Sequence, residues 1–91
     1  QVICWALLAE LRFAGGQHLT ESWDDYPVLK FSEVPEIHTR LIGPQDELPL
    51  GAGEISSGPA GAAVVNAVRN ALGVVPDRLP LSRHALVTLL S

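Results

Sequence analysis

The distribution of apolar residues predicts helices at the start of the chain and in its second half. Residues 1–11 are apolar on nearly every side, which indicates a mostly buried helix of about three turns. A second helix is expected between Pro59, at a first-turn position, and Gly73, where a helix-ending glycine belongs. Ser82 is a typical N-cap for a short terminal helix that carries leucines on one face.

Between the first two predicted helices the patterns are extended. Residues 14–16 break the first helix, and residues 17–23 alternate imperfectly, as in a strand. Residues 24–27 are typical of a turn, and residues 36–42 alternate polar and apolar side chains like a strand. The chain is therefore predicted to be α+β, with two main helices and a short terminal helix packed on a small, mostly antiparallel sheet.

The long segment from 43 to 58 has no period of either kind. Loops of this length inside a domain are usually functional or disordered. Its glycine and apolar content disfavours disorder.

Length and charge restrict the function. The 91 residues are expected to form a single unit, 1–91, and a domain of this size buries only about 60% of its unfolded surface, too little to enclose a large cofactor unaided. The net charge of −4 argues against binding nucleic acid or an anionic membrane. Residues 1–50 hold most of the acids, so residues 51–91 are the half expected to be buried against another surface.

The cysteine and methionine content adds two expectations. A single cysteine, Cys4, excludes an internal disulfide and a cysteine-based zinc site, and its apolar neighbours favour a place in the core. The absence of methionine indicates a piece of a longer chain. No apolar run is long enough to span a bilayer, so no membrane insertion is predicted.

One acid stands out in the long loop. Glu54 follows Gly51, Ala52 and Gly53, and glycine permits positive φ and a close approach of the backbone to a ligand. The amides at the start of the following helix can face an anion or a developing negative charge. These residues alone leave two interpretations open: a carboxylate aimed at a bound centre, and a solvated acid in a surface loop.

Other chemically active residues favour structural roles. His18, His38 and His84 are too widely spaced for a local metal-ligand motif, so no metal ligands are predicted and the histidines are expected on the surface. Trp5 and Trp23 are expected in the core or at an interface.

Several short motifs occur together in an order that resembles one enzyme family. They are Gly51-Ala52-Gly53-Glu54, Pro59-Ala60, Asn66-Ala67, Ala71-Leu72-Gly73 and Arg78-Leu79-Pro80-Leu81, preceded by similar segments at 23–29 and 34–37. The chain resembles the C-terminal part of the molybdopterin-binding large subunit of molybdenum hydroxylases, the xanthine oxidase/aldehyde dehydrogenase family. Within that family it is most similar to the isoquinoline 1-oxidoreductase β-subunit type. It departs from the family at Val2, where a glycine is frequent, and at Leu72, where a threonine is common.

The resemblance implies an oxidoreductase that hydroxylates an aldehyde or an N-heterocycle with water as the oxygen donor. Glu54 would be the general base at the molybdenum centre, and Gly51, Ala52 and Gly53 would shape the loop beside the cofactor. The cofactor would be molybdenum–molybdopterin, with or without a cytosine dinucleotide. The partners would be the remainder of the large subunit and an iron–sulfur small subunit, and the isolated chain is expected to be inactive and free of cofactor.

A second interpretation is a non-catalytic interaction or assembly module derived from the same family. The sequence leaves the substrate, the oligomeric state and the compartment, cytoplasmic or periplasmic, open.

Overall fold

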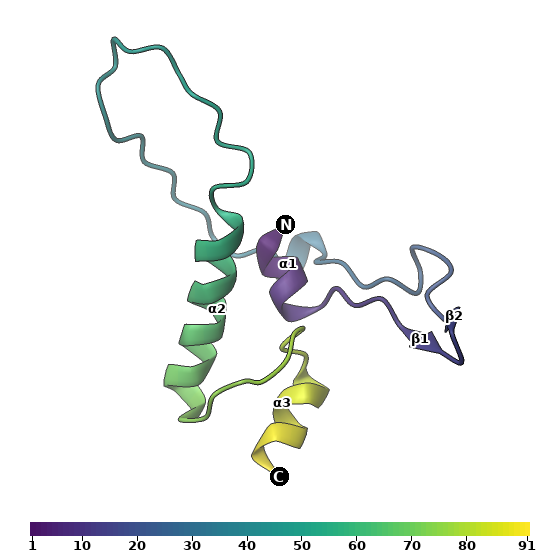
Figure 1. Cartoon of the computed structure of the whole chain (residues 1–91). Helices are drawn as coiled ribbons and strands as arrows, with labels where there is room; N and C mark the ends of the chain where they lie inside the picture. Colours follow the sequence, from purple (N-terminus) through teal and green to yellow (C-terminus); the bar gives the residue numbers. More distant parts are fainter.

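The computed structural model describes all 91 residues as three helices, one 3-10 turn and one β-hairpin joined by extended chain (Figure 1). In order these are α1 (Val2–Leu7), β1 (Phe13–Ala14), β2 (Gln17–His18), η1 (Phe31–Glu33), α2 (Ser57–Leu72) and α3 (Arg83–Leu90). The predicted α+β class, with two main helices, a short terminal helix and an antiparallel sheet, is confirmed. None of the helices combines the length and the apolar character that crossing a membrane requires.

The small core lies where α1, α2 and the segment before α3 meet. α1 packs on α2 at Gly61, where an added Cβ would lie 3.8 Å from Cγ1 of Val2. The amide of Leu81 donates a hydrogen bond of 2.6 Å to the carbonyl of Ala6 and so ties the C-terminal segment to α1. The buried residues are Cys4, Ala6, Pro80 and Leu81. The expectation of a core position for Cys4 is confirmed.

The predicted C-terminal end of α2 and the predicted N-terminal cap of α3 are both confirmed. Gly73 ends α2 with φ 70°, and its amide donates to the carbonyl of Arg69 at 2.9 Å. The Ser82 hydroxyl accepts from the Ala85 amide at 3.2 Å and caps α3. α2 begins at Ser57, with Ser56 as its N-cap residue and no side-chain capping bond.

α1 is shorter than the eleven-residue pattern predicts. The amides of Leu8 and Ala9 both donate to the carbonyl of Cys4, at 2.8 and 3.0 Å, and Leu8 leaves the helical region with φ −133°. Leu8 and Ala9 are still half-buried, whereas from Glu10 onward the chain is exposed. The chain continues as an extended arm to the hairpin.

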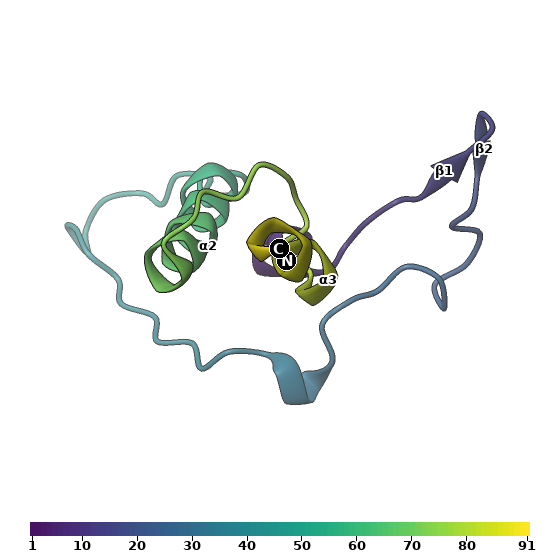
Figure 2. The ribbon, with the colours of Figure 1, turned by 90° about the horizontal axis from the view of Figure 1, so that it is seen from below.

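The sheet consists of the hairpin alone. β1 and β2 pair antiparallel, with Phe13 opposite His18, and turn through Gly15 and Gly16 at φ 57° and 77°. The predicted strand at 17–23 therefore shrinks to its first two residues. Figure 2 shows the hairpin at the end of an arm, and it contacts no helix, so the helices do not pack on the sheet as predicted.

The predicted strand at 36–42 was wrong. These residues form no strand and are fully exposed in the long loop that runs out from η1 and returns to α2 (Figure 1). An alternating pattern needs a partner strand to supply its hydrogen bonds, and none lies beside this segment. The turn predicted at 24–27 is present slightly earlier, with the Asp25 amide donating to the Ser22 carbonyl at 3.2 Å.

The chain is open rather than compact. Its radius of gyration is 16.7 Å, against about 12 Å for a compact domain of this length. Only 4 of 91 residues are buried, and Trp23 is 81% exposed, so of the two positions expected for Trp23, the core and an interface, the core is wrong. The apolar side chains of the long loop are nearly as exposed as in an unfolded chain. They are Ile37, Leu41, Ile42, Leu48, Leu50 and Ile55.

Expressed alone, the 91-residue chain is expected to unfold over a broad range of urea, because four buried residues supply too little core for a cooperative transition. A urea titration followed by circular dichroism checks this. A single steep transition, with a slope of about 1 kcal/mol/M or more, would contradict it.

Candidate functional site

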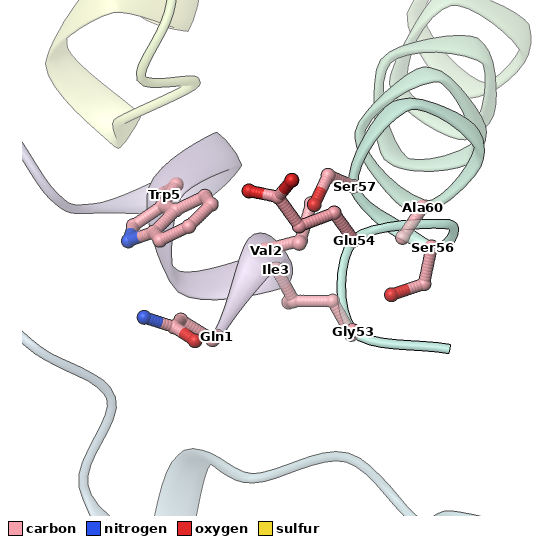
Figure 3. A pocket seen from close by; sticks show the side chains of 9 residues that line it. All are labelled: Gln1, Val2, Ile3, Trp5, Gly53, Glu54, Ser56, Ser57 and Ala60. Atoms are coloured by element: carbon pink, nitrogen blue, oxygen red, sulfur yellow. The ribbon is translucent and has the colours of Figure 1, made fainter. Parts of the chain in front are cut away.

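Glu54 lines an open pocket between the start of α1 and the loop that enters α2. The pocket has a volume of about 480 Å³. One wall comes from α1 and its N-cap and the other from the end of the long loop and the first turn of α2 (Figure 3). The lining residues are Gln1, Val2, Ile3, Trp5, Gly53, Glu54, Ser56, Ser57 and Ala60.

Backbone hydrogen bonds fix Glu54 relative to α2. The Ser57 amide donates to the Glu54 carbonyl at 3.1 Å, and the Ala60 amide donates to the Ser56 carbonyl at 2.9 Å. Glu54 therefore begins a turn that leads directly into the first turn of α2. Because α2 packs on α1, this turn also sets Glu54 opposite the α1 side of the pocket.

The Glu54 carboxylate is free to act on a bound molecule. It is exposed, and the side-chain hydrogen bonds that the chain makes to carboxylates go only to Asp25 and Glu33. The one other contact between a carboxylate and a nitrogen-bearing side chain joins Glu36 to His38 Nε2, at 3.0 Å. Figure 3 shows the Glu54 carboxylate extending from the loop toward the α1 side of the pocket.

The other lining side chains are neutral. Gln1 contributes an amide, Ser56 and Ser57 contribute hydroxyls, and the remaining side chains are apolar. Glu54 is therefore the one ionisable side chain of the pocket. A lone carboxylate among neutral groups is suited to accept a proton or to attract positive charge.

Of the three residues predicted to shape the loop before Glu54, only one lines the pocket. Gly53 lines the pocket beside Glu54, whereas Gly51 and Ala52 lie in the exposed loop outside it. Neither glycine has positive φ, since those conformations occur at Gly15, Gly16, Gly43 and Gly73. Gly53 contributes space instead: an added Cβ would meet no atom of the chain within 4 Å.

Sequence reasoning missed seven of the nine lining residues, all except Gly53 and Glu54. Trp5 was expected in the core or at an interface but is 46% exposed and lines the pocket. No local motif signals this, because Trp5 and Glu54 lie far apart in the sequence and meet only through the packing of α1 on α2.

The histidines lie outside the pocket. His18 stacks against Phe13 with ring centroids 4.5 Å apart, and His38 pairs with Glu36. All three histidines are exposed, which confirms the predicted surface positions. No group of three or more His, Cys, Asp or Glu side chains could hold a metal ion.

Three curated proteins are similar to this chain. A nicotinate dehydrogenase subunit of Pseudomonas putida is 34% identical over 76 residues, and the match covers 84% of this chain. A probable xanthine dehydrogenase subunit of Bacillus subtilis is 30% identical over 89 residues, or 91% of this chain. The β-subunit of isoquinoline 1-oxidoreductase of Brevundimonas diminuta is 33% identical over 76 residues, or 84% of this chain.

These relatives support the molybdenum hydroxylase family. All three are named as subunits of oxidoreductases, and the chain spans only 6%, 12% and 10% of their respective lengths. No family model matches the chain. No solved structure matches it at a significant level.

The pocket residues would suit contact with a molybdenum–molybdopterin cofactor, and further groups would be needed to hold it. The pocket is open to one side and has no cationic side chain for a phosphate, so its side chains alone do not anchor the cofactor. The Gln1 amide can donate to and accept from a pterin edge, and Glu54 is free to face the reacting centre. These residues therefore suit contact with the cofactor rather than its retention.

The glycines of α2 and its loop are expected to differ in their tolerance of alanine. Gly73→Ala places a side chain at φ 70° and costs about 1 kcal/mol, which raises amide hydrogen exchange in the last turn of α2 about fivefold. Gly53→Ala has neither strain nor a clash and leaves exchange unchanged. Hydrogen-exchange mass spectrometry of the full-length protein checks both. Faster exchange in Gly53→Ala would show that Gly53 has a structural role.

Proposed function

We propose that this chain is the part of a molybdenum hydroxylase large subunit that supplies the general base, Glu54. The whole protein hydroxylates an aldehyde or an N-heterocycle and takes the oxygen from water. The observation that carries the proposal is a carboxylate without any partner in the chain, in an open pocket of neutral side chains. The similarity to three oxidoreductase subunits supports the reaction class.

Glu54 has the properties that a general base needs. Its oxygens accept no hydrogen bond from the chain, so they can take up the proton of the attacking water. Its backbone is held by the turn into α2, so only the side-chain torsions of Glu54 have to be ordered at each turnover. When bound, the molybdenum cofactor supplies the two-electron chemistry, which no side chain of this pocket can provide.

The neighbouring loop residues have a simpler role in this proposal. Gly53 leaves room beside Glu54 for the cofactor or the substrate. Gly51 and Ala52 carry the chain past the pocket and shape the loop from outside it. Within the family we propose the isoquinoline 1-oxidoreductase type, on the resemblance of the motifs around Glu54.

Two kinds of partner belong to this proposal, and the exposed apolar surface supports the first. The side chains of the long loop need another polypeptide to cover them, and the remainder of the large subunit is the proposed cover for this C-terminal segment. An iron–sulfur small subunit is the proposed electron acceptor. The relatives are themselves named as subunits, which supports a multi-subunit assembly.

Glu54→Gln in the full-length enzyme is expected to lower kcat by about 10²–10⁴, because the amide cannot accept the proton. Molybdenum content is expected to stay unchanged, since Glu54 is not needed to hold the cofactor. Steady-state kinetics and metal analysis of the same preparation check both. Glu47→Gln, in the exposed loop outside the pocket, is the matched control. Normal turnover by Glu54→Gln would remove Glu54 from the mechanism.

A non-catalytic assembly module is the second candidate, because the exposed apolar side chains suit any protein interface equally well. Metal content separates the two. Purified full-length protein is expected to contain molybdenum and a fluorescent pterin, whereas the 91-residue chain alone is expected to contain neither, as its pocket lacks an anchor for the cofactor. Full-length protein that contains no molybdenum after expression with cofactor biosynthesis would favour the module.

A further inference from the structure

We propose that residues 36–42 join the remainder of the large subunit as an added β-strand, whose backbone pairs with the free edge of a sheet there. This inference rests on the proposed place of the chain in a large subunit, and it names how the two parts are joined. The segment forms no strand in the chain alone, so the strand belongs to the assembly.

The first support is the state of the backbone. Residues 36–42 contain neither a helix nor a turn, and their N–H and C=O groups make no hydrogen bond with any part of this chain (Figure 1). Pro35 precedes the segment and Gly43-Pro44 follows it. Seven extended residues span about 23 Å, a common strand length. Once such a backbone is buried its polar groups need partners, and a second strand supplies them in a regular row.

The second support is the alternation of the side chains. One face is polar except at its last position, and its members are Glu36, His38, Arg40 and Ile42. The Glu36 carboxylate lies 3.0 Å from His38 Nε2, so side chains two positions apart already share a face, as they do in a strand. On the other face Ile37 and Leu41 are 72% and 82% exposed. The segment thus carries the apolar face and the polar face of a strand in a sheet with one solvated side.

The third support concerns the partner. A helix has paired its own backbone groups, whereas the edge of a sheet presents an unpaired row of them. Within this chain the one sheet is the hairpin, whose strands have two residues each and are too short to pair with seven. The edge therefore comes from outside the 91 residues. Each relative offers ample polypeptide for it, because the chain spans 12% or less of its length.

Hydrogen exchange of the full-length protein tests the pairing, with mass spectrometry that resolves single amides by electron-transfer fragmentation. In a strand added to an edge, alternate amides donate to the neighbouring strand and the others point away from it. Alternate amides of residues 37–42 are therefore expected to exchange at least 100-fold more slowly than in an unstructured chain. Residues 45–48, which lie in the outer loop, are expected to show no such alternation.

Two proline variants test the same point by removing neighbouring amides. Of Thr39→Pro and Arg40→Pro, one deletes an amide that faces the partner strand and the other an amide that faces away. One variant is expected to bring exchange in 37–42 to within about threefold of the unstructured rate, and the other to change it less than about threefold. Glu47→Pro is the matched control and is expected to leave exchange in 37–42 unchanged. If a proline variant does not fold, the exchange pattern of the unsubstituted protein decides the matter alone.

Four results would overturn the inference. They are fast exchange at every amide of 37–42, slow exchange at every one of them, equal effects of the two proline variants, and protection that is lost when a dimer is diluted to monomers. Slow exchange throughout would put the segment between two strands. Loss on dilution, followed by gel filtration, would make the partner a second copy of the protein.

Molybdenum content and turnover separate this inference from the proposed function, because the exchange pattern depends on neither. If the full-length protein lacks molybdenum, or if Glu54→Gln keeps full turnover, the proposed function fails while alternate protection at 37–42 still establishes the added strand. If the protein is loaded and Glu54→Gln is inactive, but residues 37–42 exchange fast, the proposed function stands and the added strand fails.

Discussion

The contact between α1 and α2 is the constraint on which the other features depend. Gly61 lies in this contact, where an added Cβ would be in ordinary van der Waals contact with Val2, 3.8 Å from its Cγ1. The hydrogen bond from Leu81 to Ala6 adds the C-terminal segment to the same contact. Both walls of the Glu54 pocket belong to this pair of helices and their approaches, so the geometry of the site is a product of one helix packing.

The packed part of the chain is the pair α1 and α2 with the segment before α3, and the rest of the chain makes few tertiary contacts. The hairpin and the long loop extend away from the helices and bury almost nothing (Figures 1 and 2). Their apolar residues are those of a protein interior, yet this chain provides no opposing surface. In the proposed assembly, the remainder of the large subunit supplies that surface.

Sequence patterns predicted the parts of the fold that local chemistry determines. The end of α2 at Gly73 and the cap of α3 at Ser82 follow from single-residue preferences, and both were correct. The strand expected at 36–42 failed because a strand depends on a partner that sequence alternation alone does not supply. The pocket residues show the same difference. A short motif singled out Glu54, which lines the pocket, whereas Trp5 lies beside it only because α1 packs on α2.

The length of the loop between η1 and α2 has a consequence for how this chain tolerates change. Glu54 is fixed by the turn into α2 and not by the outer part of that loop, which makes no long-range hydrogen bond. Closing a flexible loop costs only about 0.6 kcal/mol more for each doubling of its length. Insertions and deletions near its tip would thus leave the backbone of Glu54 and the start of α2 in place, so the outer loop can change in length without altering the pocket at its base.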